Sequence, residues 1–199
     1  MFVDRDKDTP LLYTVDNGDI VGCKLLMDNG ADSCVRNRAD ETTTWIAAYR
    51  GHSDLLRYLI VHGNPPLSVP SRGLDRTVLG YTPHIFDVAH TPLYVAVYHK
   101  HFAVAELLLD AGVMIWDEQW CWNCDLLTEM NHDLSQQASL CARLTAAMSE
   151  PPPLRQIVRH FLRRHFGQRV LSATPLLEIP NTLKDYLTLR SLEKRKYVQ

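Results

Sequence analysis

The chain has 199 residues, of which 46% are hydrophobic and 22% are charged, and its formal net charge is −2. This composition is that of a chain that can bury a core, and it excludes wholesale disorder. No apolar run approaches the roughly 20 residues of a membrane span, and no basic segment followed by an apolar one opens the chain. We therefore expect a cytoplasmic or nuclear protein that binds no membrane, with its five cysteines as free thiols.

The first half of the chain contains an internal repeat. Three copies, at residues 9–30, 42–63 and 91–112, each begin with threonine and end with glycine 21 positions later. The first two copies are 33 residues apart, a period that is typical of stacked helical pairs. The second and third copies also contain small alanines, Ala47, Ala48 and Ala96, which allow neighbouring helices to approach closely.

The positions that recur among the copies have local structural roles. Thr9 and Thr91 precede prolines and are expected to cap the first helix of their pair. Gly18 and Gly51 are expected to form the turn between the paired helices, where Lys100 stands in the third copy and predicts a strained or reshaped turn. A left-handed glycine is expected to end the second helix of each pair. These closing glycines are Gly30, Gly63 and Gly112.

The motifs Thr-Pro-Leu, Gly-His at residues 51 and 52, and Leu-Leu-x-x-Gly resemble the ankyrin repeat. The resemblance implies an all-α solenoid of about three repeats over residues 1–112. Between the second and third copies, residues 65–90 contain 16 more residues than the repeat period requires. This long loop is either a tolerated insertion or a segment that contacts a partner.

Residues 113–150 lose the repeat pattern and are expected to form a degenerate helical cap. Leu140 and Leu144 share one face of a helical stretch with Leu134, Cys141 and Met148. Such a helix would cover the apolar end of the stack. Cys121 and Cys124, followed by His132 and Cys141, raise the alternatives of a zinc site or a redox pair. Their aromatic and aliphatic neighbours favour a packing role, so no metal ion or cofactor is expected.

The C-terminal part has a different charge from the rest of the chain. Residues 1–153 carry 11 Lys and Arg against 20 Asp and Glu, whereas residues 154–199 carry 10 against 3. The arginines alternate with apolar residues and are expected to form the polar side of an amphipathic helix, which is favoured over a nucleic-acid patch. Gly167 is expected to end this helix, and Asn181 to cap a final one. The apolar residues of the first helix are Leu154, Ile157, Val158, Phe161 and Leu162.

The ordered set of triple proline, basic amphipathic helix, glycine, Ile-Pro and Leu-Lys-Asp-Tyr-Leu resembles the SOCS box. The resemblance implies a small three-helix unit over residues 151–190, followed by a basic tail at 191–199. Its elongin-binding motif, Leu-x-x-x-Cys-x-x-x-aliphatic, falls on Leu154, Val158 and Leu162, with Ile157 and Phe161 beside them. The cullin-binding Leu-Pro-x-Pro motif falls on residues 177–180, with Glu178 in place of the first proline. The cullin-binding residues implied are Leu177, Ile179, Pro180, Leu183, Tyr186 and Leu187.

The whole chain thus resembles the ankyrin repeat and SOCS box family. This resemblance implies a substrate-recognition subunit of a ubiquitin ligase, with elongin B/C, a cullin with its RING protein, and an unidentified protein substrate as partners. The substrate is expected to contact the turns and first helices of the repeats. The matching residues are Asp16, Asn17, Tyr49, Arg50, Tyr98 and His99.

Two other functions remain to be weighed on the residues alone. The C-terminal helices could only cap the stack, which would make the protein an ankyrin scaffold or inhibitor without ligase activity. An enzyme is the weakest alternative, because no G-x-S-x-G, phosphate-binding loop, H-E-x-x-H or well-spaced Cys/His pair occurs. We therefore expect a non-catalytic protein-binding subunit.

Overall fold

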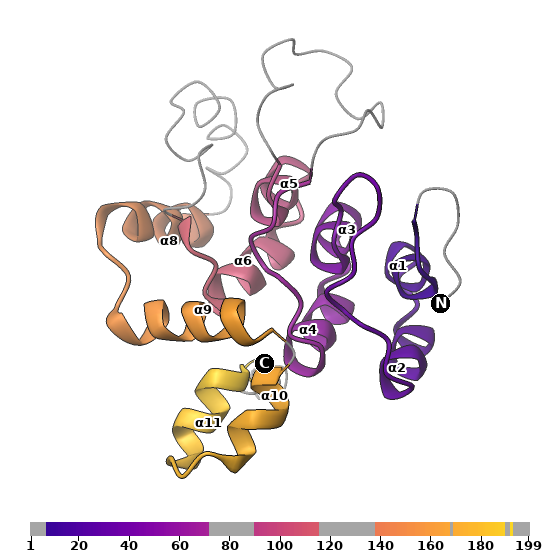
Figure 1. Cartoon of the computed structure of the whole chain (residues 1–199). Coiled ribbons are helices and arrows are strands. Elements are labelled where there is room, and N and C mark those ends of the chain that lie inside the picture. The colour runs from indigo at the N-terminus through magenta and orange to yellow at the C-terminus, as the bar shows by residue number, and fades with distance from the viewer. Residues whose placement is uncertain (1–6, 72–89, 116–137, 168, 190–191, 193–199) are drawn as a thin grey trace.

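The computed structural model describes residues 7–71, 90–115, 138–167, 169–189 and 192. Within these ranges the expected all-α fold is confirmed, with helices throughout and two isolated β-bridges. Figure 1 shows helical pairs stacked side by side, a further helix after the third pair, and the C-terminal helices lying against one side of the stack. No helix in the described ranges has the length and hydrophobicity needed to cross a membrane.

Three helical pairs form the repeat stack. The first helices of the pairs form one row and the second helices form another (Figure 1). The pairs are α1 (Pro10–Asp16) with α2 (Ile20–Asp28), α3 (Thr43–Arg50) with α4 (Ser53–His62), and α5 (Pro92–Tyr98) with α6 (Phe102–Ala111).

Threonine caps the first helix of each pair, as the sequence predicts for Thr9 and Thr91. The hydroxyl oxygens of Thr9, Thr42 and Thr91 accept hydrogen bonds from backbone N–H groups three residues later, at 3.4, 3.2 and 3.2 Å. These bonds satisfy N–H groups that have no partner within the helix. Pro10 and Pro92 occupy the first helical turn, where a missing N–H removes no helical bond.

Small buried residues and two histidines join neighbouring repeats. Ala47, Ala48 and Ala96 are fully buried, which allows α3 and α5 to pack closely. His52 Nε2 lies 3.3 Å from the Asp16 carbonyl oxygen of the preceding repeat, and His101 Nε2 lies 3.1 Å from that of Tyr49. Each histidine therefore links its own repeat to the turn of the repeat before it.

One closing glycine differs from expectation. Gly30 and Gly112 are left-handed, with φ of +82° and +86°, but Gly63 has a φ of −104°. The left-handed residue here is Asn64, with a φ of +51°. Gly63 is instead required by close packing, because a Cβ atom there would lie 2.8 Å from the Met27 Cε and Ser33 Oγ atoms. The prediction of a left-handed Gly63 was wrong.

The turn at Lys100 is strained, as expected from the missing glycine. Lys100 has a φ of +62°, a conformation that costs a residue with a Cβ atom roughly 1–2 kcal/mol. We expect Lys100→Gly to raise the free energy of unfolding by about 0.5–1 kcal/mol, because the relief of strain exceeds the added freedom of glycine in the unfolded chain. Urea denaturation measures this difference. Lys100→Ala keeps the strain and is expected to give no gain; an equal gain from alanine would contradict the explanation.

Helix α8 (Ala138–Ser149) covers the end of the stack next to α6. Leu140 and Leu144 are buried in the shared core, and Arg143 Nη2 donates to Asp110 Oδ1 over 2.7 Å. Of the proposed zinc ligands, Cys121, Cys124 and His132 lie outside the described residues, as does most of the long loop, at 72–89. Cys141 lies on α8 and is half-buried, and the described residues contain no group of three potential metal ligands.

The C-terminal unit consists of α9 (Leu154–Phe166), α10 (Arg169–Ala173), the 3₁₀ turn η3 (Thr174–Leu176) and α11 (Asn181–Thr188). Gly167, with a φ of +53°, ends α9 as predicted. Asn181 is the first residue of α11 and Pro180 precedes it, so no side chain caps this helix. The prediction of an Asn181 cap was wrong, because the rigid proline occupies the capping position.

Candidate functional site

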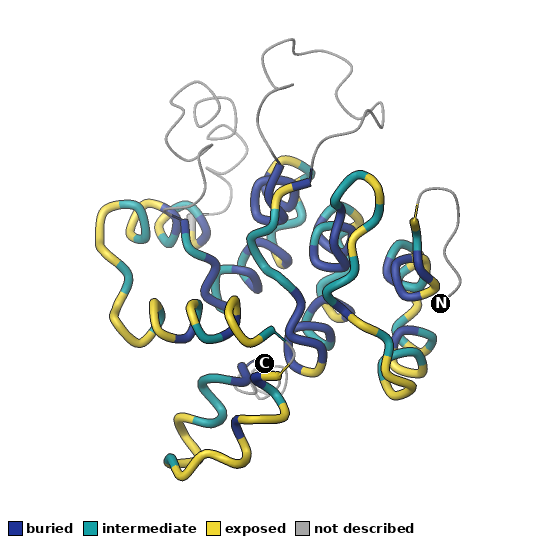
Figure 2. The backbone as a smooth tube through the Cα atoms, in the orientation of Figure 1, coloured by how far each residue is buried: buried dark blue, intermediate teal, exposed yellow. Residues whose placement is uncertain are grey.

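The apolar residues of α9 face solvent. We call Leu154, Ile157, Val158, Phe161 and Leu162 the apolar stripe. Leu162 is half-buried, and exposed fractions of the others are 76% for Leu154, 42% for Ile157, 45% for Val158 and 62% for Phe161. Figure 2 shows the exposed residues along this helix. A row of large exposed apolar side chains marks a candidate binding surface.

Two of the four arginines of α9, in contrast, face the interior, whereas Arg155 and Arg164 are exposed. Arg159 and Arg163 are only 7% and 8% exposed, which corrects the expectation that the basic side of this helix is solvated. Arg163 donates from Nη2 to the carbonyl oxygen of Ile60 over 3.1 Å and from Nη1 to that of Leu187 over 3.2 Å. Burial, and next the charge of Arg159, lower the pKa of Arg163 to about 9, so this guanidinium stays charged at neutral pH. Helix α9 therefore turns Arg159 and Arg163 to the protein and the apolar stripe to water.

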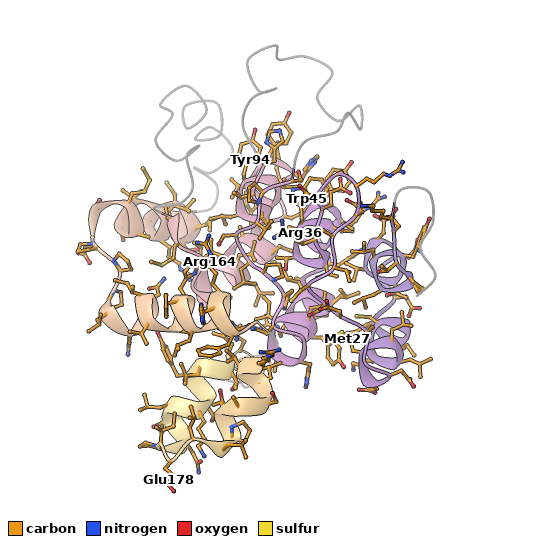
Figure 3. All side chains as sticks on the ribbon, viewed as in Figure 1. Met27, Arg36, Trp45, Tyr94, Arg164 and Glu178 are labelled. Atoms are coloured by element: carbon orange, nitrogen blue, oxygen red, sulfur yellow. The ribbon has the colours of Figure 1, made fainter. Side chains whose placement is uncertain are left out.

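The residues implied for cullin binding divide into two groups. Leu177, Pro180 and Leu183 are exposed and Ile179 is half-buried, and Glu178 lies at the far end of the C-terminal unit from the repeats (Figure 3). Tyr186 and Leu187 are half-buried inside the unit. The guanidinium of Arg159 lies 4.3 Å from the centre of the Tyr186 ring, and Leu187 binds Arg163 through its carbonyl oxygen.

Two exposed large apolar residues of this unit are absent from the sequence-based set. Phe166 is 46% exposed and Leu176 is 83% exposed. Phe166 continues the four-residue spacing from Val158 and Leu162, so extending the periodicity by one turn finds it. Leu176 precedes Leu177 directly in the chain but lies in η3, where no helical periodicity applies, and only the tertiary structure shows that it is exposed.

The residues expected to contact a substrate meet at the first helices of the repeats. Arg50 donates to both carboxylate oxygens of Asp16, at 2.8 and 3.0 Å, and its guanidinium lies 5.3 Å from the centre of the Tyr49 ring. The Tyr49 and His99 rings touch edge to face at 4.9 Å. Asn17 lies apart, donating from its side chain to the Tyr13 carbonyl oxygen at the end of α1. The structure thus brings together five of the six, because Tyr98 also contacts His99, at 5.3 Å.

These rings belong to a longer row than the sequence predicts. Trp45 stacks on Tyr49 at 5.4 Å, and Tyr94 stacks between Tyr98 at 5.8 Å and His90 at 4.9 Å. Trp45 and Tyr94 project from the neighbouring helices α3 and α5 (Figure 3). We call Trp45, Tyr49, His99, Tyr98, Tyr94 and His90 the aromatic row. Burial, and next His101, lower the pKa of His99, and burial lowers the pKa of His90, so both histidines in this row are neutral at pH 7. Such rigid aromatic side chains are favoured at protein interfaces.

The fold and these surfaces define a class of protein: a helical repeat stack that carries a separate helical docking unit. Family models agree with both parts. The model described as "Ankyrin repeats (3 copies)" matches residues 11–119, and the model described as "SOCS box" matches residues 150–188. No curated protein matches the chain.

The chain belongs to the ankyrin repeat and SOCS box family. Both parts are typical of non-catalytic adaptors, and SOCS boxes in general bind elongin B/C and cullin complexes. This combination is characteristic of substrate receptors of cullin–RING ubiquitin ligases.

Proposed function

We propose that this protein is the substrate-recognition subunit of an elongin B/C–cullin–RING ubiquitin ligase. The observation that carries the proposal is the apolar stripe, which the fold leaves in water while it buries Arg159 and Arg163 of the same helix. A helix that only capped the repeats would turn the stripe toward them. The stripe is therefore available to a partner, and α8 already packs against α6 at the end of the stack.

The stripe has the chemistry of a helix that enters an apolar groove. Leu154, Val158 and Leu162 are spaced four residues apart, which places them along one side of α9. Val158 stands where the elongin-binding motif has cysteine, and both are small apolar side chains. Elongin C is therefore proposed to receive this side of α9.

The exposed residues after α10 form the proposed cullin contact. Leu177, Pro180 and Leu183 lie on the surface together with the half-buried Ile179. Tyr186 and Leu187 contribute from inside the unit, because they hold α11 against α9 through Arg159 and Arg163.

The repeats are proposed to bind the protein substrate through the exposed Tyr98, the half-buried Trp45, Tyr49 and His99 of the aromatic row, and their neighbours. Tyr94 and His90 of the row are buried and support these rings from below. Arg50 is already paired with Asp16, so their charges cancel. The proposed binding surface therefore consists of aromatic rings and one ion pair. A bound substrate would be held near the ubiquitin-charged enzyme, which raises its effective concentration. The protein itself would catalyse no reaction and need no cofactor. The proposed substrate contacts are Asp16, Asn17, Tyr49, Arg50, Tyr98 and His99.

Co-expression with elongins B and C tests the proposal. The full chain is expected to purify with both elongins as a complex of one copy each, measured by size-exclusion chromatography with light scattering. Addition of a purified cullin–RING pair is then expected to give ubiquitin transfer. A chain that elutes alone, folded and without elongins, would contradict the proposal and favour the scaffold alternative.

A further inference from the structure

The buried arginines of α9 lie where the C-terminal unit meets the repeats. Ile60 lies in the last turn of α4 and Leu187 in the last turn of α11. The carbonyl groups in the last turn of a helix have no partner within it and carry the negative end of the helix dipole. Arg163 binds both carbonyl oxygens at once. One planar guanidinium thus joins the ends of a repeat helix and a C-terminal helix, and its charge is balanced by two dipoles.

Arg159 makes the second contact, one helical turn away. Its guanidinium lies between the ring of Tyr186 on α11 and the backbone of Gly112 at the end of α6. A Cβ atom on Gly112 would collide with its Nη2 atom. The third repeat therefore receives Arg159 at a place that only glycine leaves open.

Two further polar contacts cross the same boundary. The Asn64 side chain donates to the carbonyl oxygen of Gly167, which ends α9. Arg57 of α4 donates to the carbonyl oxygen of Leu192 over 2.8 Å. We call these contacts, together with those of Arg159 and Arg163, the seam. The seam lies on the side of α4 and α6, whereas the aromatic row lies on α3 and α5.

We propose that Arg159 and Arg163 are positioning residues, which fix the direction of the apolar stripe relative to the substrate-binding side of the repeats. The consequence of this orientation for ubiquitin transfer rests on the proposed function. The fixed orientation of the C-terminal unit on the repeats does not depend on it. Both arginines are on the opposite side of α9 from the stripe, so the contacts that orient the unit leave the elongin-binding side untouched.

The choice of arginine explains why the orientation is fixed. An apolar side chain could fill the same space, and such replacements of buried charges often keep or raise stability. However, apolar contacts are non-directional and allow several packings, whereas a planar fork bound to two carbonyl oxygens fits one arrangement. Loss of Arg163 is therefore expected to leave both parts folded and to widen the range of their relative orientations.

Distance measurements between the two parts test this inference. Spin-labelled non-natural residues at the exposed positions Asn29 and Thr182 report the distance from α2 to α11 in the full chain, with and without elongins B and C. Wild type is expected to give one narrow distribution. Arg163→Met is expected to widen it at least twofold, with the helical circular dichroism retained and elongin affinity changed less than threefold. The matched control is Arg164→Met on the exposed neighbour, which is expected to match wild type.

An unchanged distribution in Arg163→Met would overturn the inference. If Arg163→Met loses its helical circular dichroism signal, Arg163→Lys replaces it as the test variant. Lysine keeps the charge but cannot donate to both carbonyl oxygens as a planar fork. A wider distribution in the folded lysine variant supports the inference, and a narrow one overturns it. Failure of the wild type to bind elongins would contradict the proposed function alone, because the distances are also measured in the free chain.

Discussion

Leu154→Arg is expected to weaken the binding of elongin B/C by at least about 100-fold. Leu154 is 76% exposed in the free chain, and its burial in an apolar groove would contribute about 1.5–3 kcal/mol. An unpaired arginine in that groove adds a desolvation cost of several kcal/mol. Since each 1.4 kcal/mol is a factor of about ten in affinity, the two effects together exceed two orders of magnitude. Isothermal titration calorimetry with purified elongin B/C measures the loss.

Val21→Arg is the matched control for this experiment. Val21 is equally an exposed aliphatic residue on a helix, at 73%, but it lies on α2 of the first repeat. We expect Val21→Arg to bind elongin B/C as wild type does and Leu154→Arg to retain the unfolding free energy of wild type. Equal binding by both variants would contradict the assignment of the stripe.

Gly112→Ala is expected to lower the free energy of unfolding by about 2–4 kcal/mol. Gly112 ends α6 with a φ of +86°, a conformation that favours glycine. The added methyl group would also displace the buried guanidinium of Arg159, which cannot move without leaving the Tyr186 ring. Chemical denaturation followed by circular dichroism measures the loss.

Gly30→Ala separates the cost of backbone strain from the cost of the collision with Arg159. Gly30 ends α2 with nearly the same φ, +82°, and nothing lies within 4 Å of the position of its Cβ atom. Only the backbone strain remains there, and the lower freedom of alanine in the unfolded chain offsets part of it, so we expect a loss of about 0.5–1 kcal/mol. The difference between the variants measures the contact with Arg159. Equal losses would show that Gly112 serves only to end its helix.

Much of the local structure follows from neighbouring residues. Thr9 and Thr91 before proline were sufficient to place helix starts, and Lys100 in a glycine position was sufficient to predict strain. These predictions succeed because hydrogen bonds within a few residues and the limits on φ determine the outcome. At Gly63 the same logic failed, since packing against Met27 and Ser33 required the glycine and Asn64 took the left-handed conformation.

The candidate site was only partly predictable from the sequence. The three- and four-residue spacing from Leu154 to Leu162 defined a stripe, and one more turn would have included Phe166. The sequence also identified Tyr49, Tyr98 and His99 as members of the repeat surface. It could not place Trp45 and Tyr94 in the same row, because contacts between rings of different repeats depend on how closely α3 and α5 pack.

The sequence by itself determined that the chain folds into helical repeats followed by an amphipathic helix, because residue spacing and capping act locally. It did not determine which side of that helix the protein buries. Apolar periodicity alone would place Leu154 inside and Arg163 in water. Only the tertiary structure brings the carbonyl-bearing ends of α4 and α11 together around Arg163, where two dipoles can hold a buried charge, and so leaves the apolar stripe exposed.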